Sequence, residues 1–120
     1  MHATHKNEPF ERGIVLFNAQ EFFKAHEAWE ELWLQAPGEE KAFLQGIIQI
    51  AAAFHHYRRG NLRGSKSLVA AGIAKLREYP ALHFEVDVAR LVSEAQAWID
   101  TVGDRVDTGQ RPWPKIHRTG

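Results

Sequence analysis

The sequence contains no cysteine, one methionine and only five prolines in 120 residues. Without cysteine the chain forms no disulfide, no thiolate metal site and no thiol nucleophile. It also lacks net charge, because fifteen Lys and Arg residues balance fifteen Asp and Glu residues, so no overall field attracts nucleic acid or an anionic membrane. No apolar run reaches the roughly 18 residues of a membrane span, and the first residues lack the apolar core of a signal peptide. We therefore expect a cytoplasmic protein that binds neither nucleic acid nor membrane.

What the sequence does contain is a helical pattern of apolar residues at spacings of three and four, with no alternation typical of a strand. Glycine and proline divide the chain into five helical segments, at roughly 7–18, 20–35, 39–59, 61–79 and 84–102. The connections are short, so neighbouring helices should pack antiparallel. The pattern predicts an all-α, up-and-down antiparallel bundle of four to five helices.

We expect residues 1–103 to form one bundle domain and residues 104–120 to form a C-terminal tail packed on the bundle or trailing from it. Pro112 and Pro114 flank Trp113 and favour an extended backbone there. Trp113 and Ile116 are predicted to lie in a groove of the bundle, and a frayed tail is the alternative.

The third segment is apolar or small on nearly every side, which is typical of a central helix. Gln45, Gln49 and His56 form a polar line along it, at spacings of four and seven. Buried amides need partners, and each unmet group costs about 1–3 kcal/mol. We therefore expect other helices to cover this line and supply polar partners.

The second segment offers such partners in His26 and Glu30, which lie one helical turn apart at the edge of its apolar face. Glu27 should point further toward solvent. We expect His26 and Glu30 to meet the polar line of the third segment between two packed helices. A carboxylate in that position has a pKa open to tuning by desolvation or by an imidazolium neighbour, so Glu30 and His26 are the candidate catalytic residues.

Three motifs carry a family resemblance. They are Phe-Asn-x-x-x-Phe-Phe-x-Ala-His-Glu-x-x-Glu-x-x-Trp at 17–33, Phe-Leu-Gln-Gly-Ile-Ile-Gln-Ile-Ala-Ala-Ala-x-His at 43–55 and Gly-Asn-Leu-x-Gly at 60–64. In this order they resemble the family called domain of unknown function 309. The resemblance implies a small all-helical domain without an established activity. It also implies the following signature positions: His26, Glu27, Glu30, Trp33, Gln45, Gly46, Gln49, Gly60, Asn61 and Gly64.

Several functions fit these residues. His26, Glu30 and His56 can be ligands of a divalent metal, because ligands at i and i+4 reach one ion. A small ligand is the second hypothesis. Its site would comprise His26, Glu27, Glu30, Trp33, Gln45, Gln49, His56 and Asn61. The Glu-x-x-Glu spacing also suggests a helical nucleotide pyrophosphohydrolase, but the second acidic pair that would hold magnesium is missing.

The alternative is a non-catalytic interaction module in which the polar cluster is a structural hydrogen-bonded network. The wide apolar surface of the third segment and the long apolar stripe of the fifth favour a homodimer or another partner. Asn61 is then a helix cap, and the basic stretch 58–66 complements the end of the third segment instead of binding an anion.

Overall fold

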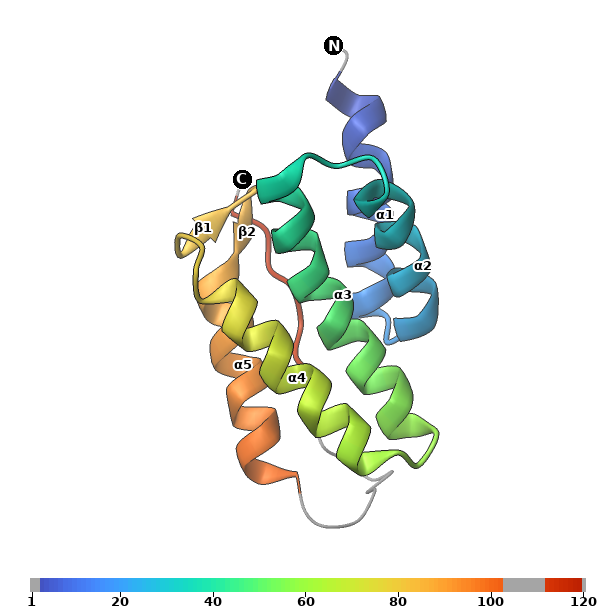
Figure 1. Ribbon diagram of the computed structural model, residues 1–120, viewed down its shortest axis with the longest axis vertical. Helices are drawn as coiled ribbons and strands as arrows, with labels where there is room; N and C mark the ends of the chain where they lie inside the picture. Colours follow the sequence, from blue (N-terminus) through green and yellow to red (C-terminus); the bar gives the residue numbers. More distant parts are fainter. Residues whose placement is uncertain (1–2, 103–111, 120) are drawn as a thin grey trace.

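The computed structural model describes residues 3–102 and 112–119, and it confirms the predicted helical class. The helices are α1 (Ala3–Asn18), α2 (Phe22–Trp33), α3 (Gly38–Arg58), α4 (Leu62–Leu76) and α5 (Val88–Thr101). Figure 1 shows α3 in the middle, with α1 and α2 on one side and α4 and α5 on the other. Across the described part of the chain, none of the helices has the length and apolar character that crossing a bilayer requires.

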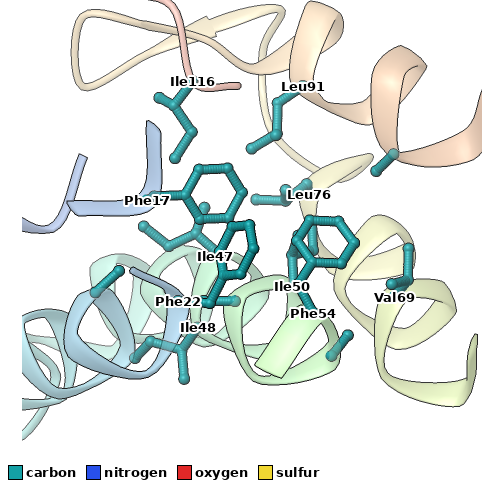
Figure 2. Packing of buried hydrophobic residues seen from close by; sticks show 14 of the residues in the cluster. Phe17, Phe22, Ile47, Ile48, Ile50, Phe54, Val69, Leu76, Leu91 and Ile116 are labelled. Carbon is teal, nitrogen blue, oxygen red and sulfur yellow. The ribbon is translucent and has the colours of Figure 1, made fainter. Parts of the chain in front are cut away.

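The core is built around α3, ten of whose residues are buried. Phe43, Ile50 and Phe54 are completely buried there, as the helical spacing of their apolar side chains predicts. Figure 2 shows Phe54 and Ile50 packed between residues of α4 and the aromatic rings of α1 and α2. The approach of α4 depends on Gly72, because a Cβ there would lie 2.7 Å from the carbonyl oxygen of Gly46.

A two-stranded hairpin interrupts the helical pattern between α4 and α5, where the sequence predicts no strand and a helix from Phe84. Strands β1 (Leu82–His83) and β2 (Val86–Asp87) pair antiparallel. Phe84 and Glu85 form the turn between them, with left-handed φ angles of 53° and 59°. The Asp87 carboxylate then accepts a hydrogen bond from the Arg90 N–H at 3.0 Å and caps α5. The prediction of a helix from Phe84 was wrong because this aspartate cap starts the helix at Val88.

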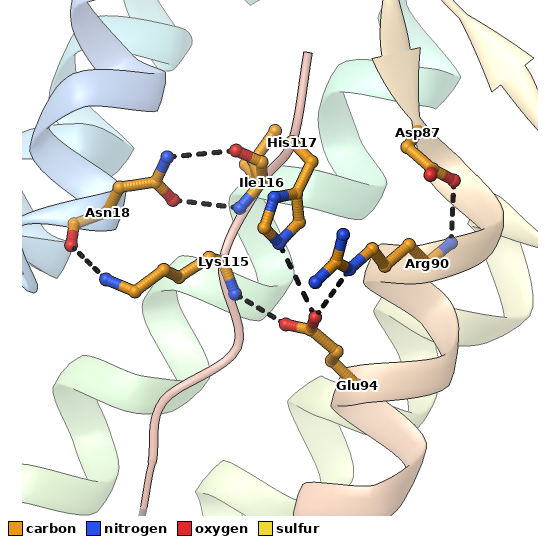
Figure 3. Close-up of polar contacts among 7 residues, drawn as sticks. All are labelled: Asn18, Asp87, Arg90, Glu94, Lys115, Ile116 and His117. Atoms are coloured by element: carbon orange, nitrogen blue, oxygen red, sulfur yellow. Dashed lines mark hydrogen bonds and ion pairs between the residues drawn. The ribbon is translucent and has the colours of Figure 1, made fainter. Parts of the chain in front are cut away.

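Residues 112–119 lie extended along the bundle. The Asn18 amide pairs with both backbone groups of Ile116, accepting from its N–H at 2.8 Å and donating to its carbonyl at 2.9 Å. The Lys115 N–H donates to the Glu94 carboxylate at 2.9 Å, and Figure 3 shows both anchors. Ile116 is buried and Trp113 is half-buried against the core, which confirms the predicted groove. The expected boundary at residue 103 lies outside the described residues.

Candidate functional site

Helix α2 packs its apolar side against the core, and its signature residues lie along the edge of that side. Trp29 is fully buried, and its indole N–H donates to the Phe10 carbonyl at 3.1 Å. His26 and Glu30 lie at the edge, with 3.9 Å between His26 Nε2 and Glu30 Oε2. Glu27 is exposed, as the sequence predicts.

The Glu30 side chain is 53% exposed and the His26 side chain 25% exposed. The prediction that the pair lies between two packed helices was therefore wrong for Glu30. Gln45, Gln49 and His56 on α3 and His26 on α2 are each only partly exposed, so neither edge is fully covered by a neighbouring helix. A solvent-screened pair of this kind contributes at most about 1 kcal/mol to stability.

On α3, the side chains of Gln45, Gln49 and His56 are partly exposed. Within residues 3–102 and 112–119, none of the three forms a hydrogen bond or an ion pair with His26 or Glu30. Gln49 Oε1 is buried and has no partner in this part of the chain. The predicted hydrogen-bonded network is therefore not formed among these residues.

Trp33 is the last residue of α2 and contacts the start of α3. The Lys41 ammonium lies 4.4 Å from the centre of its ring, a cation–π contact between the end of α2 and the start of α3. Trp33 Nε1 is buried and lacks a hydrogen-bond partner among the described residues. Buried indole N–H groups are usually paired, so this donor is an exception, as is the Gln49 acceptor.

Two residues that the sequence analysis did not select, Phe23 and His55, join α2 to α3 here. The Phe23 ring centre is 5.9 Å from that of His26 and 5.0 Å from that of His55. His55 in turn lies 6.0 Å from His56. The signal was present, since Phe23 precedes His26 by one turn within the first motif and His55 ends the second. We call the following partly or wholly exposed residues the α2–α3 face: Phe23, His26, Glu30, Trp33, Gln45, Gln49, His55 and His56.

The pKa of His55 lies below the ordinary histidine value of 6.5. Desolvation by burial is the largest cause, and the positive charges of Arg59, His56, His26 and Arg58 add to it. The imidazole is therefore uncharged at neutral pH, and it can both donate and accept a hydrogen bond.

This lowered pKa gives a pH prediction. In the unfolded chain His55 binds a proton near pH 6.5, whereas in the folded chain it does so only at lower pH. The unfolded state therefore gains protons first, and the stability due to the neutral imidazole is lost as the pH falls below 6.5. Urea unfolding at pH 7.5 and 5.5 should show a smaller loss of stability for His55→Gln than for the parent chain. Equal losses in the two proteins would contradict the prediction.

The proposed metal ligands do not come together as a set. His26 and Glu30 are neighbours, but no group of three or more His, Cys, Asp or Glu side chains suited to a metal ion occurs among residues 3–102 and 112–119. Asn61 lies at the far end of α3, where its side-chain oxygen accepts from the Gly64 N–H at 2.9 Å and caps α4. A Cβ at Gly64 would lie 2.6 Å from the Asn61 amide, so the Gly-Asn-Leu-x-Gly motif has a structural explanation.

Comparison with known proteins gives one family and two relatives. The family model described as Domain of unknown function (DUF309) matches residues 10–68. The uncharacterized protein YpuF of Bacillus subtilis (strain 168) is 39% identical over 66 residues, which are 53% of this chain and 38% of YpuF. An uncharacterized protein of Aquifex aeolicus (strain VF5) is 26% identical over 97 residues, which are 80% of this chain and 28% of that protein. The chain thus spans well under half the length of both relatives.

Proposed function

This chain belongs, through residues 10–68, to the DUF309 family, and from that premise we propose that it is a binding module that holds a peptide segment on its α2–α3 face. The observation that carries the proposal is the exposure of Phe23, whose side chain is left 48% exposed between two imidazoles. The fold gains little from an aromatic ring in that position. Aromatic side chains of this kind are frequent anchors of protein interfaces.

The polar groups that are open on this face support a peptide as the partner. A peptide backbone carries one hydrogen-bond donor and one acceptor per residue. The neutral His55 imidazole and the partly exposed Gln45 amide can hydrogen-bond to such groups without requiring a charged partner.

The lengths of the relatives also support the proposal of a binding module. The matched segment makes up 38% of one relative and 28% of the other, so a related domain occurs within two longer chains. A domain that recurs as part of longer proteins suits a binding role. The peptide held by the α2–α3 face then belongs to another part of such a chain or to a second protein.

A matched pair of variants tests this proposal. Phe23 and Val15 are both exposed apolar residues, but Val15 lies on α1, outside the α2–α3 face. Peptides selected from a random library on the parent chain should bind at least tenfold more weakly to Phe23→Ser, because interface anchors contribute 2 kcal/mol or more. They should bind Val15→Ser as they bind the parent. Equal binding to all three proteins would overturn the proposal.

The same variants test a homodimer. If the segment held on this face is part of a second copy, the parent should sediment as a dimer that Phe23→Ser dissociates and Val15→Ser does not. A dimer that neither variant changes would place the contact between copies elsewhere on the bundle.

The second candidate is a divalent metal or a small ligand at His26 and Glu30, and the observation in its favour is their 3.9 Å contact on adjacent turns. Water or an atom of the ligand would complete the coordination, because His56 does not form a three-residue group with this pair among the described residues. Zinc or manganese should then raise the melting temperature of the parent but not that of the double variant His26→Asn with Glu30→Gln. If the metals shift both proteins equally, this candidate is excluded.

A further inference from the structure

A separate cavity lies at the end of the bundle where the hairpin, α1 and the start of α3 meet. It has a volume of about 320 Å³, within the range of sites that hold small molecules. Its apolar walls are Phe10, Leu32, Leu44 and Phe84. Charged side chains also line it, namely Glu11, Glu40, Glu85 and Arg118.

The charge of this cavity is negative on balance. Arg118 forms ion pairs with Glu11 and Glu85, and its guanidinium is 2.9 Å from the Glu85 carboxylate. Glu40 has no hydrogen-bond or ion-pair partner within the described residues. One guanidinium therefore faces three carboxylates.

Arg12 and Lys41, which follow Glu11 and Glu40 in the sequence, are not among the lining residues and have other partners. Arg12 pairs with Glu31 at 3.3 Å, and the Lys41 ammonium lies over the Trp33 ring. The cavity thus keeps an excess of about two negative charges beside apolar walls.

The wall contributed by the hairpin is strained. Phe84 and Glu85 both adopt left-handed φ angles, in a two-residue turn that usually contains Asn-Gly. In this conformation the Phe84 ring lies 5.8 Å from that of Phe10, and Glu85 reaches Arg118. Phe84 nevertheless remains 38% exposed. Strain of this kind gathers at functional sites, where it holds side chains in a required position.

We propose that this cavity binds a small organic cation, a primary amine or guanidinium attached to an aromatic or branched aliphatic body. The body packs on the apolar walls, and the cation lies near the Glu40 carboxylate and the faces of the phenylalanine rings. Cations are attracted to such ring faces by the electrostatic quadrupole. This site is independent of the α2–α3 face.

The test uses 2-phenylethylamine as the probe, with the neutral 2-phenylethanol and the anionic phenylacetate as matched controls on the full chain. NMR titration should show the amine binding with a dissociation constant near 1 mM, as expected for a ligand of nine heavy atoms. The alcohol should bind at least threefold more weakly, and phenylacetate should not bind. Added salt should weaken the binding of the amine.

Variants locate the binding. Glu40→Gln should raise the dissociation constant of the amine about threefold, which is the effect of losing one exposed charge pair. The neighbouring Glu39→Gln should have no effect, because Glu39 is not among the lining residues. Phe84→Asn, which suits the left-handed turn, should weaken binding while the protein stays folded. Equal binding of amine and alcohol, or unchanged binding in Glu40→Gln, would overturn the proposal. So would loss of binding in Phe23→Ser, which would assign the amine to the α2–α3 face.

Discussion

Replacement of Trp113 by alanine is expected to lower the free energy of unfolding by about 3 kcal/mol, the lower end of the range for large aromatic residues in a core, because the ring is half-buried against the core. Residues 112–119 contact the core through this ring, Pro114 and Ile116. The Trp113 ring centre lies 5.0 Å from that of Phe22, 5.2 Å from that of Phe54 and 6.2 Å from that of Trp98. Its removal leaves these rings without a partner on one side and takes a large apolar contact from the segment that Asn18 and Glu94 anchor.

Urea unfolding followed by circular dichroism measures this loss, and two further variants control for it. Trp113→Phe should retain a large part of the stability, because a ring still contacts Phe22 and Phe54. Trp33→Ala should cost less than Trp113→Ala, because Trp33 contacts the Lys41 ammonium and no aromatic ring among the described residues. A Trp113→Ala chain as stable as the parent would show that the C-terminal segment does not contribute to the core.

Replacement of Gly13 by alanine is the second change with a large expected effect, about 3 kcal/mol or more. A Cβ at Gly13 would lie 2.1 Å from Trp29 Nε1 and 2.4 Å from Trp29 Cε2. Trp29 is completely buried and donates to the Phe10 carbonyl, so it has no space into which to move. The new methyl group therefore overpacks the α1–α2 contact and breaks a buried hydrogen bond, and each effect costs about 1–3 kcal/mol.

Gly38 provides the control for this substitution. A Cβ at Gly38 meets no atom within 4 Å, and its φ angle is not left-handed. Gly38→Ala should therefore be neutral or stabilising by up to about 1 kcal/mol, through the reduced entropy of the unfolded chain. Thermal unfolding of both variants measures the contrast. If Gly13→Ala melts at the temperature of Gly38→Ala, the packing of Trp29 on α1 is not as tight as the structure shows.

Much of the fold could be predicted from the sequence because helical periodicity is a local property. The spacing of Phe43, Ile47, Ile50 and Phe54 is enough to place α3 at the centre, and each is buried. A glycine directly after a helical apolar pattern is typical of a helix end, and Gly60 follows α3 with a left-handed φ angle of +91°. The motifs at 17–33, 43–55 and 60–64 were likewise sufficient to identify the family, whose model matches residues 10–68.

The candidate site could be predicted only in part. The sequence selects His26, Glu30, Gln45 and Gln49 by their spacing, and the structure places them on the partly exposed sides of α2 and α3. The sequence alone does not decide whether a further helix covers those sides. A polar line on an apolar helix fits a buried network and an open surface equally well, since spacing shows which residues share a side and not what lies opposite.

Only the tertiary structure decided that the α2–α3 face is partly open, that Phe23 and His55 meet across it, and that Arg118 joins Glu11 and Glu85 at the cavity beside the hairpin. Phe23 and His55 are 32 positions apart in the sequence, and Arg118 and Glu11 are 107 apart. Contacts over such separations depend on how the helices pack and on the path of residues 112–119. The sequence by itself determined the helices, their buried sides and the family, because periodicity, capping and motif spacing act within a few turns of one helix. Which exposed residues come together was decided by packing, because it brings together side chains that no local pattern relates.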